Sequence, residues 1–240
     1  MAEDTATRRD TAGSVRLGVL LGMVGGFLDA FTYVAHGGVF SNAQTGNVVL
    51  LGIFVARGNW SRALRVLLPL LAFVLGVFTA ETMTHPRVRA WIRRPMRAAL
   101  IAEIVVMVAV AFVPDRVAGF AVVVLVSYVA AVQNSTFDTL RKWPFNTVTL
   151  TGNLRTVTRS TYRALVLRTK GEGDKARSFA VVCAAFLAGA LIGALTAANW
   201  GNRAALVGAG LLGAALLLFV LEEPRHRRDA AAETAAEEEQ

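Results

Sequence analysis

The sequence predicts an all-helical integral membrane protein with about six transmembrane helices, arranged as two three-helix repeats of opposite orientation. Composition is the first reason, since 55% of the 240 residues are hydrophobic, only 18% are charged and the mean hydropathy is +0.50. The second reason is a series of long apolar segments separated by short polar ones. The third is a tripeptide, Thr-Gly-Asn, that occurs at 45–47 and again at 151–153.

Six apolar segments are long enough to span a hydrocarbon core about 30 Å thick. In chain order they are Val15–Ala35, Arg62–Thr84, Arg97–Val113, Val117–Phe137, Ser178–Ala198 and Ala204–Leu221. Two shorter amphipathic segments, Thr45–Ala56 and Thr151–Leu167, each begin at a copy of the tripeptide. Each of them lies between the first and second long segments of one half, so we interpret both as short broken or re-entrant helices.

The chain divides into two membrane repeats and two polar ends. Residues 15–113 form the first repeat and residues 114–221 the second, each with three spans and one short helix. Residues 1–14 carry both signs of charge, and residues 222–240 are rich in alanine and charged side chains. We expect both ends to be disordered and cytoplasmic.

The distribution of basic residues distinguishes six spans from eight. If the short segments do not cross the membrane, only five of the 25 Lys and Arg residues lie outside. If both cross, eight lie outside, among them the five arginines of residues 87–97. Because Lys and Arg gather on the cytoplasmic side, we predict six spans with both termini cytoplasmic. Three spans per half is an odd number, which inverts the second half relative to the first, as in many secondary transporters.

The two tripeptides have the composition of helix starts that face a ligand. A threonine hydroxyl can cap free N–H groups, glycine permits close approach, and an asparagine amide adds a donor and an acceptor. A helix that starts inside the membrane also presents the positive end of its dipole. The residues of the tripeptides that we expect to line a polar midplane site are Thr45, Gly46, Asn47, Thr151, Gly152 and Asn153. The alternative is that both copies only cap helices at the membrane surface.

Polar residues around the tripeptides complete the predicted site. Asp29 lies within the first long segment, where an ionised carboxylate costs roughly 3 kcal/mol or more, and it is our candidate for binding a proton or a cation. The alternative for Asp29 is a position at the outer interface. The matching place in the second half holds Gln133 and Asn134, which are polar but uncharged. Asn42 precedes the first tripeptide, and Arg155 follows the second, where it either favours an anionic solute or sets the topology.

Other ionisable and reactive residues do not indicate a catalytic or metal site. For Glu103 we favour pairing with a nearby arginine such as Arg97 over a functional role. Cys183 is the single cysteine, and the three histidines lack the spacing of zinc ligands. The net charge of +8 comes from residues that flank apolar segments, which indicates topology and contact with anionic lipid instead of nucleic acid. We therefore predict no enzyme, no metal and no cofactor.

Glycines spaced by four residues predict close helix packing in two of the spans. The first span contains Gly18, Gly22 and Gly26, and the fifth contains Gly189 and Gly193. Small residues at this spacing occupy one helix face and let two backbones approach closely.

Four short motifs of this chain occur together in a known group of proteins. They are Gly25–Ala30 (GGFLDA), Ser41–Asn47 (SNAQTGN), Gln133-Asn134 and Thr151–Leu154 (TGNL). With them the chain resembles the YoaK family of bacterial multi-pass membrane proteins, over about 15–221. The resemblance implies an integral protein of the bacterial plasma membrane, and it implies no substrate, cofactor or catalytic residue.

Broken helices within inverted halves predict a transport function. We expect a small secondary transporter or channel for a small polar or anionic solute, with Asp29 as the proton or cation site. One alternative is a non-transporting scaffold or accessory subunit, in which the tripeptides are packed against protein. A less favoured alternative is an intramembrane lipid-modifying enzyme. The expected partners are the lipid bilayer and the solute, and association of identical chains is left open.

Overall fold

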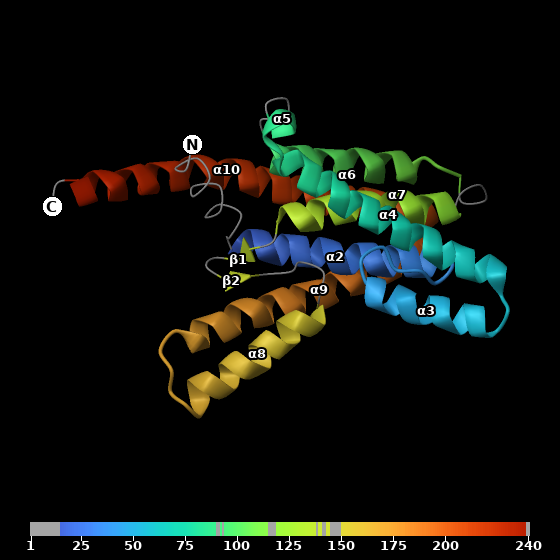
Figure 1. Ribbon diagram of the computed structural model, residues 1–240, viewed down its shortest axis with the longest axis horizontal. Coiled ribbons are helices and arrows are strands. Elements are labelled where there is room, and N and C mark those ends of the chain that lie inside the picture. The colour runs from blue at the N-terminus through green and yellow to red at the C-terminus, as the bar shows by residue number, and fades with distance from the viewer. Residues whose placement is uncertain are drawn as a thin grey trace.

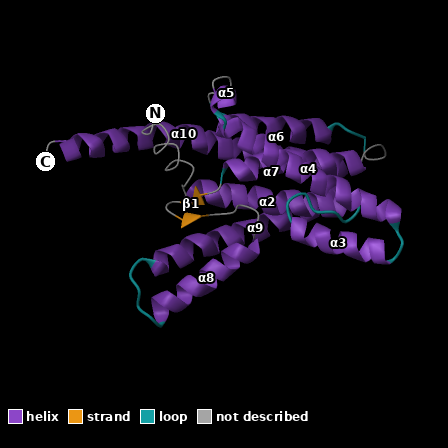
Figure 2. Ribbon diagram, viewed as in Figure 1, coloured by secondary structure: helices purple, strands orange, loops and turns teal. Residues whose placement is uncertain are grey.

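The computed structural model describes most of the chain between Val15 and Glu238. The described residues are 15–89, 92, 94–114, 119–137, 139–140, 143–144 and 150–238. The predicted N-terminal region 1–14 lies outside them. Nearly all described residues are helical, as Figure 2 shows. The predicted all-helical class is confirmed apart from one short antiparallel pair, β1 (Thr139–Leu140) with β2 (Trp143–Pro144).

The helices follow the predicted apolar segments closely. The long helices are α2 (Val15–Ala35), α4 (Trp60–Thr84), α6 (Pro95–Ala111), α7 (Gly119–Thr136), α9 (Glu172–Trp200) and α10 (Ala205–Glu238). The short ones are α3 (Gln44–Ala56), α5 (Pro86–Arg89), α8 (Leu150–Leu165) and the 3-10 turn η1 (Gly201–Ala204). Figure 1 shows them as one elongated bundle, from which the C-terminal part of α10 projects.

Several helices have the length and surface of membrane spans. By length and apolar composition, α2, α4, α7 and the continuous stretch 172–222, which joins α9, η1 and the start of α10, can cross a membrane. Their outward faces are apolar: Phe78 on α4 is 67% exposed and Leu195 on α9 is 64% exposed. Such continuous apolar surface is unfavourable in water and favourable in lipid. The helices therefore indicate a membrane protein.

The helix contacts relate the two halves of the chain. α2 packs against α9, and α4 packs against α7. α3 packs on α4 as α8 packs on α9, α6 packs on α7 as α10 packs on α2, and α6 and α10 contact each other. The two halves therefore correspond helix by helix: α2 to α7, α3 to α8, α4 to α9 and α6 to α10. If each helix is replaced by its counterpart, the same set of contacts results. Most helix contacts therefore join a helix of one half to a helix of the other half.

Glycines bring the paired helices into backbone contact. A Cβ atom placed on Gly189 would overlap the carbonyl oxygen of Met23, and one on Gly26 would overlap that of Phe186. The predicted close packing of these two glycine-rich spans is therefore confirmed, and the two spans are each other's partners. On the second helix pair, a Cβ atom on Gly76 would overlap the carbonyl oxygen of Tyr128.

The short helices α3 and α8 begin inside the bundle and run toward opposite ends of it (Figure 1). After α2 the chain turns back, and α3 starts beside Asp29, a residue within α2. α8 starts after the β1–β2 pair and packs along α9. Both starts thus lie away from the ends of the long helices, in matching places of the two halves.

The C-terminal end differs from the predicted disordered tail. The helix α10 continues from the membrane segment through Glu238. Alanine, glutamate and arginine make up most of residues 222–238, and all three are strong helix formers. Because extending an existing helix needs no new nucleus, these residues continue the preceding helix even though Pro224 removes one backbone donor from it.

Candidate functional site

Asp29 anchors the segment that leads into α3. Its side chain is only 5% exposed, and its Oδ1 accepts hydrogen bonds from the N–H of Asn42 at 2.7 Å and of Ala43 at 3.2 Å. The Ser41 hydroxyl donates to the same oxygen at 3.3 Å. Several donors on one oxygen stabilise a buried carboxylate. All three of these bonds end on Oδ1, and the second oxygen, Oδ2, takes part in none of them.

Asn47 holds the same segment from inside α3. Its amide oxygen accepts the N–H of Phe40 at 3.0 Å, and its Nδ2 donates to the Phe40 carbonyl at 2.7 Å. The Nδ2 also donates to the side chain of Gln44 at 2.9 Å. Asn47 is fully buried. Its amide therefore serves the fold of the loop and is not offered to a ligand.

The threonines of the two tripeptides are not the helix caps that the sequence predicts. α3 begins at Gln44 with Ala43 at the N-cap, and α8 begins at Leu150, so Thr45 and Thr151 lie one residue inside their helices. The N-cap residue of α3, Ala43, has no capping side chain, and its own N–H donates to the carboxylate of Asp29 on α2.

Two backbone donors of α3 remain open. The N–H groups of Thr45 and Gly46 lie in the first turn, where a helix supplies no acceptor. Neither has a hydrogen-bond partner among the residues that the structure describes.

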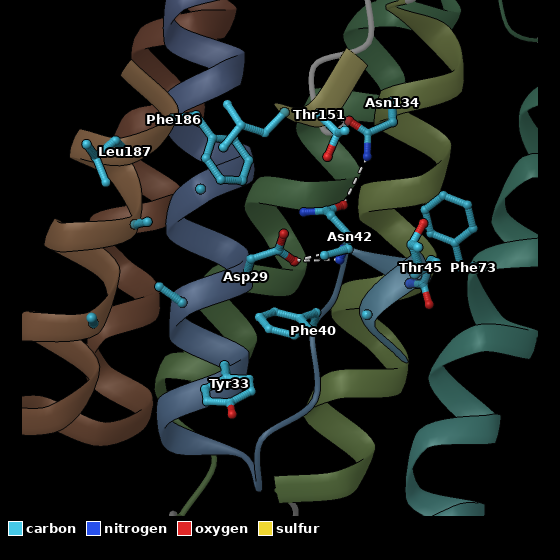
Figure 3. A pocket seen from close by; sticks show the side chains of 18 of the residues that line it. Asp29, Tyr33, Phe40, Asn42, Thr45, Phe73, Asn134, Thr151, Phe186 and Leu187 are labelled. Carbon is cyan, nitrogen blue, oxygen red and sulfur yellow. Dashed lines mark hydrogen bonds between the residues drawn. The ribbon is translucent and has the colours of Figure 1, made fainter. Parts of the chain in front are cut away.

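Asn134 connects the second half to this network. Its Nδ2, on α7, donates to the Oδ1 of Asn42 at 2.9 Å, while the backbone N–H of Asn42 is bound to Asp29. Figure 3 shows these bonds running from α2 through the loop to α7. Asp29 and Asn134, which the sequence places in corresponding parts of the two halves, are therefore connected through Asn42.

A cavity of about 1190 Å³ lies beside this network. Six of the eleven predicted site residues line it: Asp29, Asn42, Thr45, Gly46, Asn134 and Thr151. The starts of α3 and α8 thus border one space, between wall residues of α4 and α9 that include Phe73 and Phe186 (Figure 3). At this volume, it is as large as typical small-molecule sites.

Five predicted site residues do not line the cavity. They are Asn47, Gln133, Gly152, Asn153 and Arg155. Gln133 is 2% exposed and Asn153 is 4% exposed, whereas Gly152 and Arg155 are exposed on α8. Because Arg155 lies outside the lining, the positive charge that would favour an anion is not supplied to the cavity.

The described lining carries acidic and aromatic groups and no basic side chain. Its charged residues are Asp29 and Glu81, and its aromatic residues are Tyr33, Phe40, Phe73 and Phe186. From the sequence we expected Glu81, near a helix end, at the membrane interface and not in the site. The aromatic residues were missed because an apolar pattern does not mark which side chains face a cavity. The start of α3, where the sequence predicts attraction for an anion, already contacts the carboxylate of Asp29.

Glu103 contradicts the predicted pairing with an arginine. It is fully buried on α6, and neither of its carboxyl oxygens has a hydrogen-bond partner in the described ranges. Arg97 precedes it by six residues, which places the two side chains about 120° apart around a helix. Glu103 instead lies between Leu100 and Met107, which belong to the main apolar core. Across the described residues, no group of three or more His, Cys, Asp or Glu could hold a metal ion.

The long apolar helices, which enclose a cavity lined by both apolar and polar residues, define a helical membrane protein. Residues 17–218 match a family model described as protein of unknown function (DUF1275), and the chain belongs to this family. YoaK-like proteins are members of it, in agreement with the resemblance of the four motifs. No curated protein and no solved structure matches the chain.

Proposed function

We propose that the protein is a small secondary transporter or channel for a small polar solute, and that the cavity between its halves is the solute site. The observation that carries this proposal is the composition of the cavity wall. Most lining residues of one half have a counterpart at the corresponding position of the other half, and both members of each pair line the cavity. The pairs are Asp29 and Asn134, Ala30 and Ser135, Gln44 and Leu150, Thr45 and Thr151, Phe73 and Phe186, Val77 and Ala190, and Glu81 and Ala194.

The residue separations support an internal repeat. They are constant within each helix pair: 105 residues from Asp29 in α2 to Asn134 in α7, and 113 residues from Phe73 in α4 to Phe186 in α9. The close backbone contacts obey the same separations. Gly76 contacts Tyr128 as Gly189 contacts Met23, and these are equivalent positions by the same counts.

An inverted repeat of this kind supplies a mechanism. We propose six membrane spans, α2, α4, α6, α7, α9 and α10, with α3 and α8 as re-entrant helices that open toward opposite sides. A pseudo-two-fold axis through the cavity then gives two related ways of closing it, one from each side. Rocking one half against the other exposes the solute site alternately, while the carboxylate of Asp29 in the cavity wall offers a place for a proton or cation.

The charges support an orientation in the membrane, and the resemblance to bacterial multi-pass proteins supports the kind of membrane. The bundle end that holds α5 and the turn between α8 and α9 carries the described residues Arg87, Arg94, Arg168 and Lys170. Together with the polar ends of the chain, this is the basic side, and we propose that it faces the cytoplasm of a bacterium, with both termini on it. The apolar surface of α4 and α9 then faces lipid.

Two other functions make different demands on the cavity. A non-transporting scaffold or accessory subunit requires that a partner cover it and keep it dry. A lipid-modifying enzyme requires an acid–base pair at the lining, where the described carboxyl groups are Asp29 and Glu81, on different helices. We propose no enzymatic activity.

Thiol labelling of two equivalent positions tests the proposal. In a Cys183→Ser background, Thr45→Cys and Thr151→Cys are labelled in right-side-out and inverted vesicles with a small membrane-impermeant reagent. We expect both positions to react in native protein, Thr45→Cys from outside and Thr151→Cys from inside. The control is Ala130→Cys, a fully buried core position outside the lining, which should stay unlabelled. If both cavity positions react only after denaturation, the scaffold function replaces transport.

A further inference from the structure

We propose that the cavity takes a small organic ammonium ion, a solute that joins a protonated amine to an apolar body. This inference rests on the proposed function, because it names the class of solute for the same site. It departs from the anionic solute that the helix starts suggest in the sequence.

The first argument for a cation is the charge of the cavity lining. Asp29 lines the cavity and is 5% exposed, and its Oδ2 takes no part in the three hydrogen bonds that Oδ1 accepts. Glu81 adds a second carboxylate to the lining, and no described lining residue is Lys, Arg or His. An ammonium group compensates a carboxylate oxygen in a low-dielectric site, whereas an anion would be repelled by both acids.

The second argument for a cation is the position of aromatic residues near Asp29. Phe40 and Phe186 line the same cavity as Asp29, and Figure 3 shows one on each side of the carboxylate in that view. Tyr33 stacks on Phe40 with ring centroids 4.7 Å apart, which keeps that ring in place. Aromatic faces attract ammonium groups, most strongly where water is excluded. A site with a carboxylate among aromatic rings therefore favours a cation.

The size and the remaining donors distinguish an organic ion from an inorganic one. A volume of about 1190 Å³ far exceeds the space that a bare metal ion fills with its ligands. Walls such as Phe73 and Leu187 are apolar and match a hydrocarbon body. The open N–H groups of Thr45 and Gly46 can donate to an oxygen elsewhere on the same molecule.

Calorimetric titration of the full chain in lipid nanodiscs tests the solute class. The probes are n-butylammonium and n-butyrate, which are close in size and opposite in charge, and sodium chloride as the inorganic cation. We expect n-butylammonium to bind, and binding to weaken about tenfold or more in Asp29→Asn. Glu81→Gln, at an exposed position where folding is not at risk, should weaken it severalfold. The matched control is Glu103→Gln, which removes a buried carboxyl that does not line the cavity.

Each outcome decides the inference separately from the proposed function. Binding of n-butylammonium that depends on Asp29 and Glu81 supports it. Binding of n-butyrate, or heat from sodium chloride with none from n-butylammonium, overturns the ammonium class and leaves the solute site in place, provided that Thr45→Cys and Thr151→Cys label in native protein. Equal weakening by Glu103→Gln would also overturn it, because the effect would then not come from the cavity. If the cysteines do not label, the cavity is not open to solute and both proposals fail.

Discussion

The two halves of this protein present nearly the same shape to the cavity and different chemistry. Phe73 and Phe186 occupy equivalent positions on the wall, as do Thr45 and Thr151 at the helix starts. The acids, however, belong to the first half alone, because Asn134 stands where the second half matches Asp29, and Ala194 stands where it matches Glu81. The proposed repeat thus accounts for the similar walls of the cavity, and the acids of the first half account for its charge. A feature that both halves share should respond equally to equivalent mutations in the two halves. A feature of the first half alone, such as its acidic side chains, should not.

The largest effect is expected where the halves are alike. In Gly76→Leu and Gly189→Leu, the new side chain meets a backbone carbonyl of the paired helix, that of Tyr128 or Met23, which cannot move aside. We expect each to cost about 3 kcal/mol or more and to prevent assembly. The yield of monodisperse protein in size-exclusion chromatography measures this. Gly210→Leu is the control, because a Cβ atom placed on Gly210 meets no atom within 4 Å. A folded Gly189→Leu protein would contradict the backbone contact.

The next effect distinguishes the halves. Asp29→Ala removes three hydrogen bonds to one carboxylate oxygen, whereas Asn134→Ala removes the bond to Asn42. We expect losses of roughly 3 kcal/mol and about 1 kcal/mol in the free energy of unfolding. Denaturant unfolding in detergent gives both values. Equal losses would show that the first half does not dominate this network.

Asn47→Ala tests the fold of the loop. It removes both side-chain bonds to the backbone of Phe40, so we expect a loss of about 2 kcal/mol. Hydrogen exchange should show faster exchange of the Phe40 amide in particular. The equivalent change, Asn153→Ala, is the comparison, and exchange at Phe40 should stay as in the parent protein. Unchanged protection of Phe40 in Asn47→Ala would contradict the loop function of Asn47.

Ala194→Glu is designed to remove the charge difference. It supplies a carboxylate at the second-half equivalent of Glu81, on the cavity wall. We expect n-butylammonium to bind about threefold more tightly, since a partly exposed charge pair contributes less than about 1 kcal/mol. Ala194→Gln provides the uncharged control of the same size. Weaker binding in the glutamate variant alone would count against a cationic solute.

Glu103→Gln should have the smallest effect. Glu103 is buried without a hydrogen-bond partner in the described chain, and glutamine has nearly the same shape. We expect a change below about 1 kcal/mol in unfolding, since no bond to the side chain is lost. Denaturant unfolding measures it alongside Asp29→Ala. A loss comparable with that of Asp29→Ala would show that Glu103 has a partner in the membrane.

Several features of the site could be predicted from the sequence because they depend on local pattern. The apolar segment Val15–Ala35 coincides with α2, and the tripeptides lie within one residue of the starts of α3 and α8. The equivalence of Asp29 and Asn134 was visible as similar distances to two copies of one motif. The length of an apolar segment and the presence of a repeated motif are properties of short stretches of sequence, and they do not depend on how the rest of the chain folds.

Other features of the site depend on contacts between distant residues. Thr45 was expected to cap α3, but the N-cap position is held by Ala43, whose N–H donates to Asp29, fourteen residues earlier in the chain. Asn47 was expected in the solute site and is bound to Phe40. Arg155 was expected near the second helix start and lies outside the lining. In each case the side-chain type was read correctly as polar, but its partner depends on how the chain folds back.

By itself the sequence determined that this chain forms apolar helices of membrane length, interrupted at two related places, because helix length and polarity are encoded residue by residue. Only the tertiary structure decided that the two interruptions share one cavity and that its described charges are negative. Glycines that permit backbone contact between α2 and α9, and between α4 and α7, join each half to the other. Which side chains meet across that packing is set by helix rotation and register, which no single segment contains.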